Sequence, residues 1–187
     1  MLIRVFLLWV ILSGSAVWDL RERRVPNLWL AAGFLACMAA VFWEESRGSA
    51  GVYGAGAAVI CGVGSAFTAV AVTFPLFLFR MMGAGDLKLM GVICGCLGIG
   101  AGLEVIACGL AVGAFLALAR LMRGGRLRRR VSYFIAYFKR YFLTYEITAY
   151  YDPKRDGYGD SIHMALCFWG GMAIWLMTEK GGLQWGA

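Results

Sequence analysis

The chain has 187 residues, of which 61% are hydrophobic and 16% are charged, and its formal net charge is +7. Soluble domains carry roughly 25% charged residues, so this composition excludes an ordinary soluble fold and predicts a membrane protein. Lys and Arg gather on the cytoplasmic side of membrane proteins and against anionic lipid, so the excess positive charge predicts membrane topology and no nucleic-acid partner.

Apolar stretches that are long enough to cross roughly 30 Å of hydrocarbon recur along the chain. They predict an all-α, polytopic membrane protein: a six-transmembrane-helix bundle that forms one integral membrane domain over residues 1–187. Small residues recur at four-residue spacing in the third and fifth helices, where we expect helix backbones to pack closely. The expected helices span residues 2–18, 28–43, 52–79, 87–100, 103–121 and 161–178. The small residues are Gly54, Ala58, Gly62, Ala66, Gly109, Gly113 and Ala117.

A long polar segment separates the fifth and sixth helices. Its cationic run RGGRLRRR is followed by YFIAYFKRYFLTY, whose aromatic residues recur with a four-residue period. Rings on one helical face and charges on another predict an amphipathic helix, about residues 131–151, in the cytoplasmic interface of the lipid bilayer. Either this helix anchors the chain to the membrane, or it also guides an incoming apolar substrate helix.

The distribution of Lys and Arg predicts the orientation. If the first helix ends in the cytoplasm, all of these residues lie on the cytoplasmic side except Arg4, Arg47 and Lys180. The positive-inside rule therefore predicts a multi-pass protein of the plasma (inner) membrane with its N-terminus outside. A cleaved signal peptide at residues 1–16 is the alternative, and it would reverse this orientation.

Two carboxylates stand apart from the other acidic residues: Asp19 in AVWDLRERRVPN and Asp86 in GAGDLKLM. In the predicted orientation, both lie where the membrane meets the cytoplasm. A carboxylate close to hydrocarbon is costly, so this position is typical of a functional site. Gly83 and Gly85 are expected to adopt dihedrals closed to other residues and to let a substrate backbone approach Asp86. In a second GxGD sequence, GYGD, Asp160 is expected to cap the last helix.

Two neighbouring carboxylates that share a proton can hydrolyse a peptide bond without a metal or another cofactor. The ionised member activates water and the neutral member protonates or polarises the scissile carbonyl. Helix dipoles favour an ionised Asp86, at a helix start, and a protonated Asp19, at a helix end. The single histidine, His163, is expected to be structural, and the six cysteines contain no CxxC pair that would indicate a metal site.

At these residues the chain resembles the type IV prepilin peptidases, which are GxGD intramembrane aspartic proteases. The resemblance covers nearly the whole chain. Its two motifs are Asp19-x3-Arg23-x-Val25-Pro26-Asn27 and Gly83-x-Gly85-Asp86-x-Lys88. The resemblance implies that Asp19 and Asp86 are the catalytic pair. The supporting residues that it implies are Gly83, Gly85, Lys88, Arg23, Pro26 and Asn27.

The resemblance also implies a substrate: prepilin or pseudopilin precursors, cut at the cytoplasmic face after a glycine that ends a short basic leader and precedes an apolar helix. Larger members carry a cysteine-rich domain between the first two helices and also methylate the new N-terminus. Here only residues 19–27 fill that interval, so N-methyltransferase activity stays open. The short chain resembles the peptidases of tight-adherence pilus systems and the archaeal preflagellin peptidases.

Two other classes of protein also place acidic residues in the membrane. A non-enzymatic membrane subunit, either a proton-coupled carrier or an assembly scaffold for a pilus or secretion system, could also hold intramembrane acids. A carrier, however, places its polar residues near mid-membrane in repeated halves, and no internal repeat is evident. A protease like signal peptide peptidase would share the pair of aspartates but normally has a Pro-Ala-Leu element, which is missing here.

Overall fold

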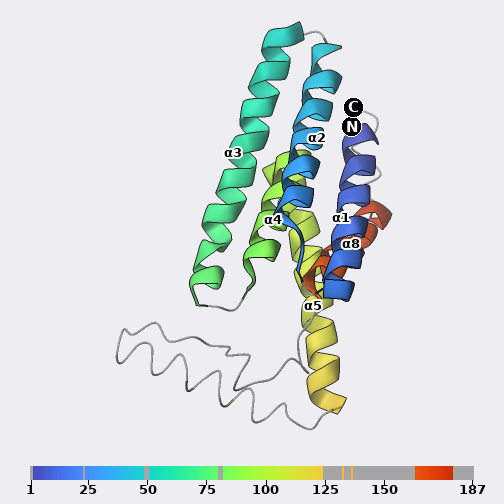
Figure 1. Cartoon of the computed structure of the whole chain (residues 1–187), viewed down its shortest axis with the longest axis vertical. Coiled ribbons are helices and arrows are strands. Elements are labelled where there is room, and N and C mark those ends of the chain that lie inside the picture. Colours follow the sequence, from blue (N-terminus) through green and yellow to red (C-terminus); the bar gives the residue numbers. More distant parts are fainter. Residues whose placement is uncertain are drawn as a thin grey trace.

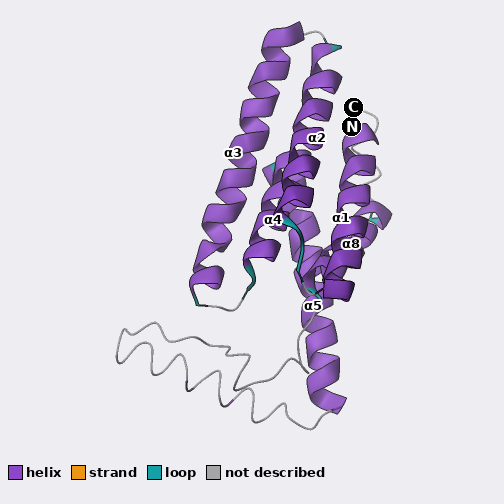
Figure 2. Cartoon of the chain, in the orientation of Figure 1, coloured by secondary structure: helices purple, strands orange, loops and turns teal. Residues whose placement is uncertain are grey.

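The computed structural model describes residues 2–22, 24–48, 51–79, 82–123, 132, 136 and 163–178. Every regular element within these residues is a helix, as the sequence predicts (Figure 2). The amphipathic helix predicted at about 131–151, apart from residues 132 and 136, and the GYGD sequence both lie outside the described residues. The helices are α1 (Leu2–Glu22), α2 (Asn27–Ser46), α3 (Gly51–Leu78), α4 (Ala84–Leu97), α5 (Ile99–Arg123) and α8 (Met164–Met177).

Four of these helices, α1, α2, α3 and α5, are long and apolar enough to cross a membrane. Helices α4 and α8 have 14 residues each. At 1.5 Å per residue they measure about 21 Å, which is shorter than the roughly 30 Å hydrocarbon core of a bilayer. The chain is therefore a polytopic all-α membrane protein in which two short helices complete the bundle.

The ends of α1 and α3 and the starts of α2 and α4 lie on one side of the bundle, which also holds the two aspartates. Short connections join α1 to α2 and α3 to α4, so that successive helices run in opposite directions. Figure 1 shows both of these connections in the lower part of the bundle, where α5 ends and α8 begins as well. The end of α1, which carries Asp19, and the start of α4, which carries Asp86, therefore lie on the same side of the protein, as the sequence predicts.

Several helix boundaries differ from the predicted ones by a few residues, and two of these differences place both aspartates within helices. Helix α1 continues to Glu22, because no helix-breaking residue precedes Pro26, which disfavours helical dihedrals at Val25. Helix α4 begins at Ala84, since Gly83 has the extended backbone of a capping residue, with φ −77° and ψ 151°. Asp19 thus occupies the last turn of α1, and Asp86 occupies the first turn of α4.

Helix α4 forms the centre of the bundle. It packs against α3, α2, α5 and α1, and its residues 89–96 are all buried. Its Met90 and Ile93 belong to one continuous core with Leu8 and Leu12 of α1 and Phe168 of α8. A helix that is apolar all round is suited to this position, and its surroundings fix the start of α4, where Asp86 lies.

Glycines allow the closest helix crossings. A Cβ atom added at Gly171 of α8 would lie 2.6 Å from the Cα atom of Gly109 of α5. A Cβ atom at Gly62 of α3 would lie 3.0 Å from the carbonyl oxygen of Gly95 of α4. Both approaches are too close for a larger side chain, so the packing role predicted for Gly62 and Gly109 is confirmed.

An ion-pair cluster joins the helices at the opposite end of the bundle. The Nε atom of Arg4 in α1 lies 2.7 Å from Oε2 of Glu44, and its Nη2 atom lies 2.6 Å from Oε1 of Glu45. The two glutamates lie in the last turn of α2. This cluster ties the start of α1 to the end of α2, so both ends of the α1–α2 pair are held.

Candidate active site

Asp19 points into the bundle because it continues the buried stripe of α1. The buried residues Val5, Leu8, Leu12 and Ser15 follow one another at intervals of three or four residues, and Asp19 comes four residues later. Its side chain is only 15% exposed. Such a position is costly for a carboxylate unless polar partners surround it.

The partners of Asp19 come from the start of α8. The Oδ2 atom of Asp19 accepts a hydrogen bond of 3.3 Å from the backbone N–H of Ala165. The Oδ1 atom lies 3.6 Å from Nδ1 of His163. Each carboxylate oxygen of Asp19 therefore faces one polar group of the first turn of α8.

Asp86 is held by its own helix start. It is the third residue of α4, and its carboxylate accepts a hydrogen bond from the backbone N–H of Gly83, the capping residue. This is the return contact of a capping box, in which an acidic side chain at the third position satisfies the N–H group of the capping residue. The side chain of Asp86 is thereby directed back toward the loop that precedes α4.

The glycines of the GxGD sequence leave space but adopt ordinary dihedrals. Among the described glycines, positive φ angles occur at Gly51 and Gly98, so the expectation of unusual dihedrals at Gly83 and Gly85 is wrong. A Cβ atom at Gly83 would lie 3.2 Å from Oδ2 of Asp86, whereas one at Gly85 would meet no atom within 4 Å. Gly83 thus makes room for the carboxylate, and the space beside Gly85 is open to another molecule.

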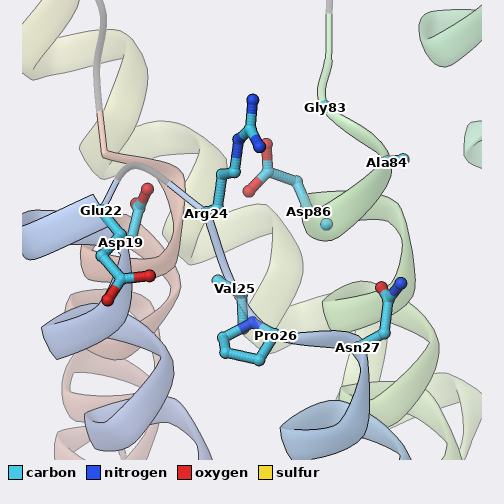
Figure 3. A pocket seen from close by; sticks show the side chains of 10 residues that line it. Asp19, Glu22, Arg24, Val25, Pro26, Asn27, Gly83, Ala84 and Asp86 are labelled. Carbon is cyan, nitrogen blue, oxygen red and sulfur yellow. The ribbon is translucent and has the colours of Figure 1, made fainter.

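Both aspartates line one cavity of about 630 Å³, which we call the aspartate cavity. Figure 3 shows Asp19 and Asp86 on either side of the linker that carries Arg24, Val25 and Pro26. The cavity thus lies where the end of α1, this linker, and the starts of α2 and α4 come together. Its lining residues are Asp19, Glu22, Arg24, Val25, Pro26, Asn27, Gly83, Ala84, Gly85 and Asp86.

Most of the other residues predicted for the site are gathered here. Pro26, Asn27, Gly83 and Gly85 line the aspartate cavity. Lys88 lies beside it, and its Nζ atom donates a 2.9 Å hydrogen bond to Oδ1 of Asn27. This bond fastens the start of α2 to the first turns of α4. Arg23, which was predicted to support the site, lies outside the described residues.

The cavity changes the acidity of Asp86. The carboxyl lies outside the four membrane-crossing helices, and its pKa is raised from 3.8 to about 6. Burial is the largest cause and the negative charge of Asp19 is the second, while the N–H group of Gly83 opposes them. The negative charge of Asp19 therefore acts on the Asp86 carboxyl.

The raised pKa of Asp86 runs against the expectation from helix dipoles, which favour an ionised Asp86. The dipole of α4 alone favours an ionised Asp86, but burial and the neighbouring negative charge outweigh it. Asp19 lies at the C-terminal end of α1, yet its carboxylate meets the N-terminal end of α8, where a negative charge is favoured. The arrangement therefore favours a proton on Asp86.

Sequence reasoning missed three residues around the pair. Glu22 and Arg24 line the aspartate cavity, and His163, which was expected to be structural, contacts Asp19. The contact of His163 could have been anticipated from the predicted topology, which puts the start of the last helix on the same side as the end of the first. The described residues contain no group of three or more His, Cys, Asp or Glu side chains that could hold a metal ion.

Comparison with known proteins adds one match. A sequence model described as the type IV leader peptidase family matches residues 5–119, which is more than half of the chain. The matched region contains Asp19 and Asp86, whereas α8 with its His163 lies beyond it. No curated protein and no solved structure gives a significant match.

Proposed function

The chain belongs to the type IV leader peptidase family and is a membrane-embedded peptidase, and we propose that it removes the short basic leader from type IV prepilin-like precursors. In this proposal it is an aspartic endopeptidase whose catalytic residues are Asp19 and Asp86. One observation carries the proposal. The two acids belong to different helices and are far apart in sequence, yet they line one cavity and interact electrostatically.

Peptide hydrolysis follows from a pair of carboxylates that share one proton. The ionised carboxylate of Asp19 takes a proton from a water molecule as its oxygen attacks the scissile carbonyl carbon. The protonated carboxyl of Asp86 gives its proton to the carbonyl oxygen. Together these two steps convert the scissile carbonyl into a tetrahedral diol. When the C–N bond breaks, the leaving nitrogen takes a proton from Asp19. One hydroxyl of the diol returns its proton to Asp86, and the products are a carboxylic acid and an amine.

Features of the aspartate cavity fit a precursor with a basic leader. Among the described residues, three acidic side chains, Asp19, Glu22 and Asp86, line it together with one base, Arg24. The open space beside Gly85 leaves room for a substrate backbone close to Asp86. A precursor whose leader ends in glycine would bring only backbone to that point, and the apolar helix that follows would remain in the lipid. We therefore name a prepilin or pseudopilin precursor as the substrate.

The proposed location is the plasma (inner) membrane, with the aspartate cavity open to the cytoplasm and the N-terminus outside. This orientation is supported by the sequence, in which nearly all Lys and Arg residues fall in the segments predicted to be cytoplasmic. An Ala84→Cys variant in a chain without other cysteines tests the orientation, since Ala84 is an exposed cavity residue. We expect a membrane-impermeant maleimide to label it in inside-out vesicles and not in intact cells. The opposite pattern would reverse the orientation.

Co-expression with a pilin-like precursor tests the activity. The precursor carries a basic leader, a glycine and an apolar helix, and its N-terminus is determined by mass spectrometry. We expect the wild-type protein to release the leader after the glycine. Asp19→Asn and Asp86→Asn should leave the precursor intact while accumulating in the membrane at wild-type amounts. Asp160→Asn, which alters the other GxGD sequence, is the matched control and should cleave nearly normally. Cleavage by an Asp86→Asn protein would refute the proposal.

A further inference from the structure

The single histidine of the chain has no part in the mechanism above. His163 immediately precedes α8, beyond the region that matches the family, and its side chain is 22% exposed. Its Nδ1 atom nevertheless lies 3.6 Å from Oδ1 of Asp19. At this distance the contact is electrostatic rather than a hydrogen bond. A histidine in this position can adjust the charge and orientation of the carboxylate that it faces.

The first turn of α8 also lacks a cap of its own. His163 occupies the capping position, but its side chain makes no capping hydrogen bond. The N–H groups of a first helical turn need acceptors from outside the helix. Asp19 supplies one from α1, because its Oδ2 atom accepts the N–H group of Ala165 at 3.3 Å. Asp19 thus caps a helix that begins far away in the sequence.

Both contacts favour the charged form of Asp19. A carboxylate that accepts a backbone N–H bond at a helix N-terminus is stabilised by that bond and by the helix dipole. The imidazole adds either a polarised N–H group or a positive charge. Because the two carboxylate oxygens have different partners, the plane of the carboxylate is fixed as well.

We infer that the first turn of α8 is a positioning element for catalysis, in which His163 and the N–H group of Ala165 hold Asp19 ionised and aimed into the aspartate cavity. This inference rests on the proposed function. His163 is a positioning residue that acts through Asp19 and does not touch the substrate. In this arrangement Asp19 keeps its charge and activates water, and Asp86 carries the shared proton.

Other charged groups lie near Asp19. Glu22 of α1, Arg24 of the linker and Asp86 of α4 line the same cavity. Arg120 of α5 acts electrostatically on Cys167 of α8, as do both aspartates. His163 differs from these groups because it alone has a side-chain nitrogen within 4 Å of the Asp19 carboxylate among the contacts of the described residues. Its removal should therefore change the ionisation of Asp19 specifically.

Two variants separate positioning from a purely structural role. His163→Ser places a good helix-capping residue before α8 but removes the imidazole from Asp19. His163→Gln keeps a donor of similar reach without a charge. The full-length proteins are reconstituted in lipid vesicles, and kcat and KM for a pilin-like precursor are measured across about pH 5 to 8, where histidine charge changes.

We expect kcat of His163→Ser to fall about tenfold, which is less than the loss of a catalytic acid or base itself, with little change in KM. Asp19 would take up a proton more readily, so the acid limb of its pH–rate profile should move to higher pH. His163→Gln should recover much of the lost kcat. A His163→Ser profile that matches the wild-type profile in height and in acid limb would overturn the inference. A fall in kcat with an unmoved acid limb would overturn it too, because that result indicates structural damage only.

An inactive Asp19→Asn control keeps this result separate from the proposed function. If Asp19→Asn is inactive and His163→Ser behaves as wild type, the inference about α8 fails while the proposed function stands. If Asp19→Asn cleaves the precursor, the proposed function itself fails. Infrared difference spectra provide a readout without a substrate. They should show a smaller ionised fraction of Asp19 in His163→Ser than in the wild type at mildly acid pH, and an equal fraction would count against the inference.

Discussion

Replacing Asp86 by Asn should abolish cleavage and at the same time stabilise the protein. Burial and the charge of Asp19 raise the pKa of Asp86 from 3.8 to about 6, a difference of about two units. Each unit corresponds to about 1.36 kcal/mol of differential interaction between the two protonation states, so ionised Asp86 costs the folded state at most about 3 kcal/mol. Asparagine occupies nearly the same volume without the charge, and its amide oxygen can still accept the N–H group of Gly83.

The gain must depend on pH in one direction. A carboxyl whose pKa is higher in the folded state than in the unfolded state costs nothing below the unfolded value of 3.8. The cost grows as the pH rises from 3.8 toward about 6 and is constant above that. Asp86→Asn should therefore be more stable than the wild type by about 1–3 kcal/mol at pH 7.5, and the difference should shrink toward zero near pH 4.

SDS titration in mixed micelles, which gives an apparent free energy of unfolding, measures this difference at both pH values. Glu22→Gln is the matched control, because it removes an exposed carboxylate from the same cavity, and it should change stability by less than about 0.5 kcal/mol. An Asp86→Asn protein that is less stable than the wild type at pH 7.5, or equally more stable at both pH values, would refute the reasoning. Either result would mean that the carboxylate is not held at an electrostatic cost.

Three further predictions concern the scaffold around the pair. Gly171→Val should destabilise the protein by about 1–3 kcal/mol in the same titration, because the new side chain overlaps the backbone of Gly109; an unchanged midpoint would contradict the α5–α8 crossing. Arg4→Gln should cost about 2 kcal/mol by leaving two carboxylates without their cation, with little effect on the cleavage rate; stability equal to the wild type would show that the ion pairs contribute nothing. Lys88→Met should slow cleavage several-fold at nearly constant stability, because it frees Asn27 beside the cavity; an unaltered rate would remove Lys88 from the site.

The sequence predicts the helices well and their ends less well. Long apolar runs define helices that cross a membrane, and the six predicted helices are all present among the described residues. The last turn of α1 was not predicted because Arg21 and Glu22 end the apolar run, although both residues form helix readily. Helix α4 begins early because Gly83 can cap it, which a hydropathy pattern does not reveal.

The candidate site, too, was predicted only in part: the sequence indicates which residues come together but not the surroundings of each. Charge distribution predicts that Asp19 and Asp86 lie at one membrane face, and the family resemblance implies that Asn27 and Lys88 lie beside them. The environment of each acid depends on contacts that no local pattern encodes. Asp19 meets a backbone N–H group 146 residues away, and this contact places it at a helix start rather than at a helix end. The raised pKa of Asp86 likewise follows from burial and from the charge of Asp19, which a dipole argument on its own helix does not include.

The coupling between the two carboxylates tests the central claim most directly. The pKa of Asp86 is measured by infrared titration in the wild-type protein and in Asp19→Asn, with Asp86→Asn used to identify its carboxyl band. We predict a wild-type value of about 6 that falls when Asp19 loses its charge, because that charge is the second largest cause of the raised pKa. A value that is the same in both proteins would mean that the two acids do not act on each other, and a shared catalytic proton would be excluded.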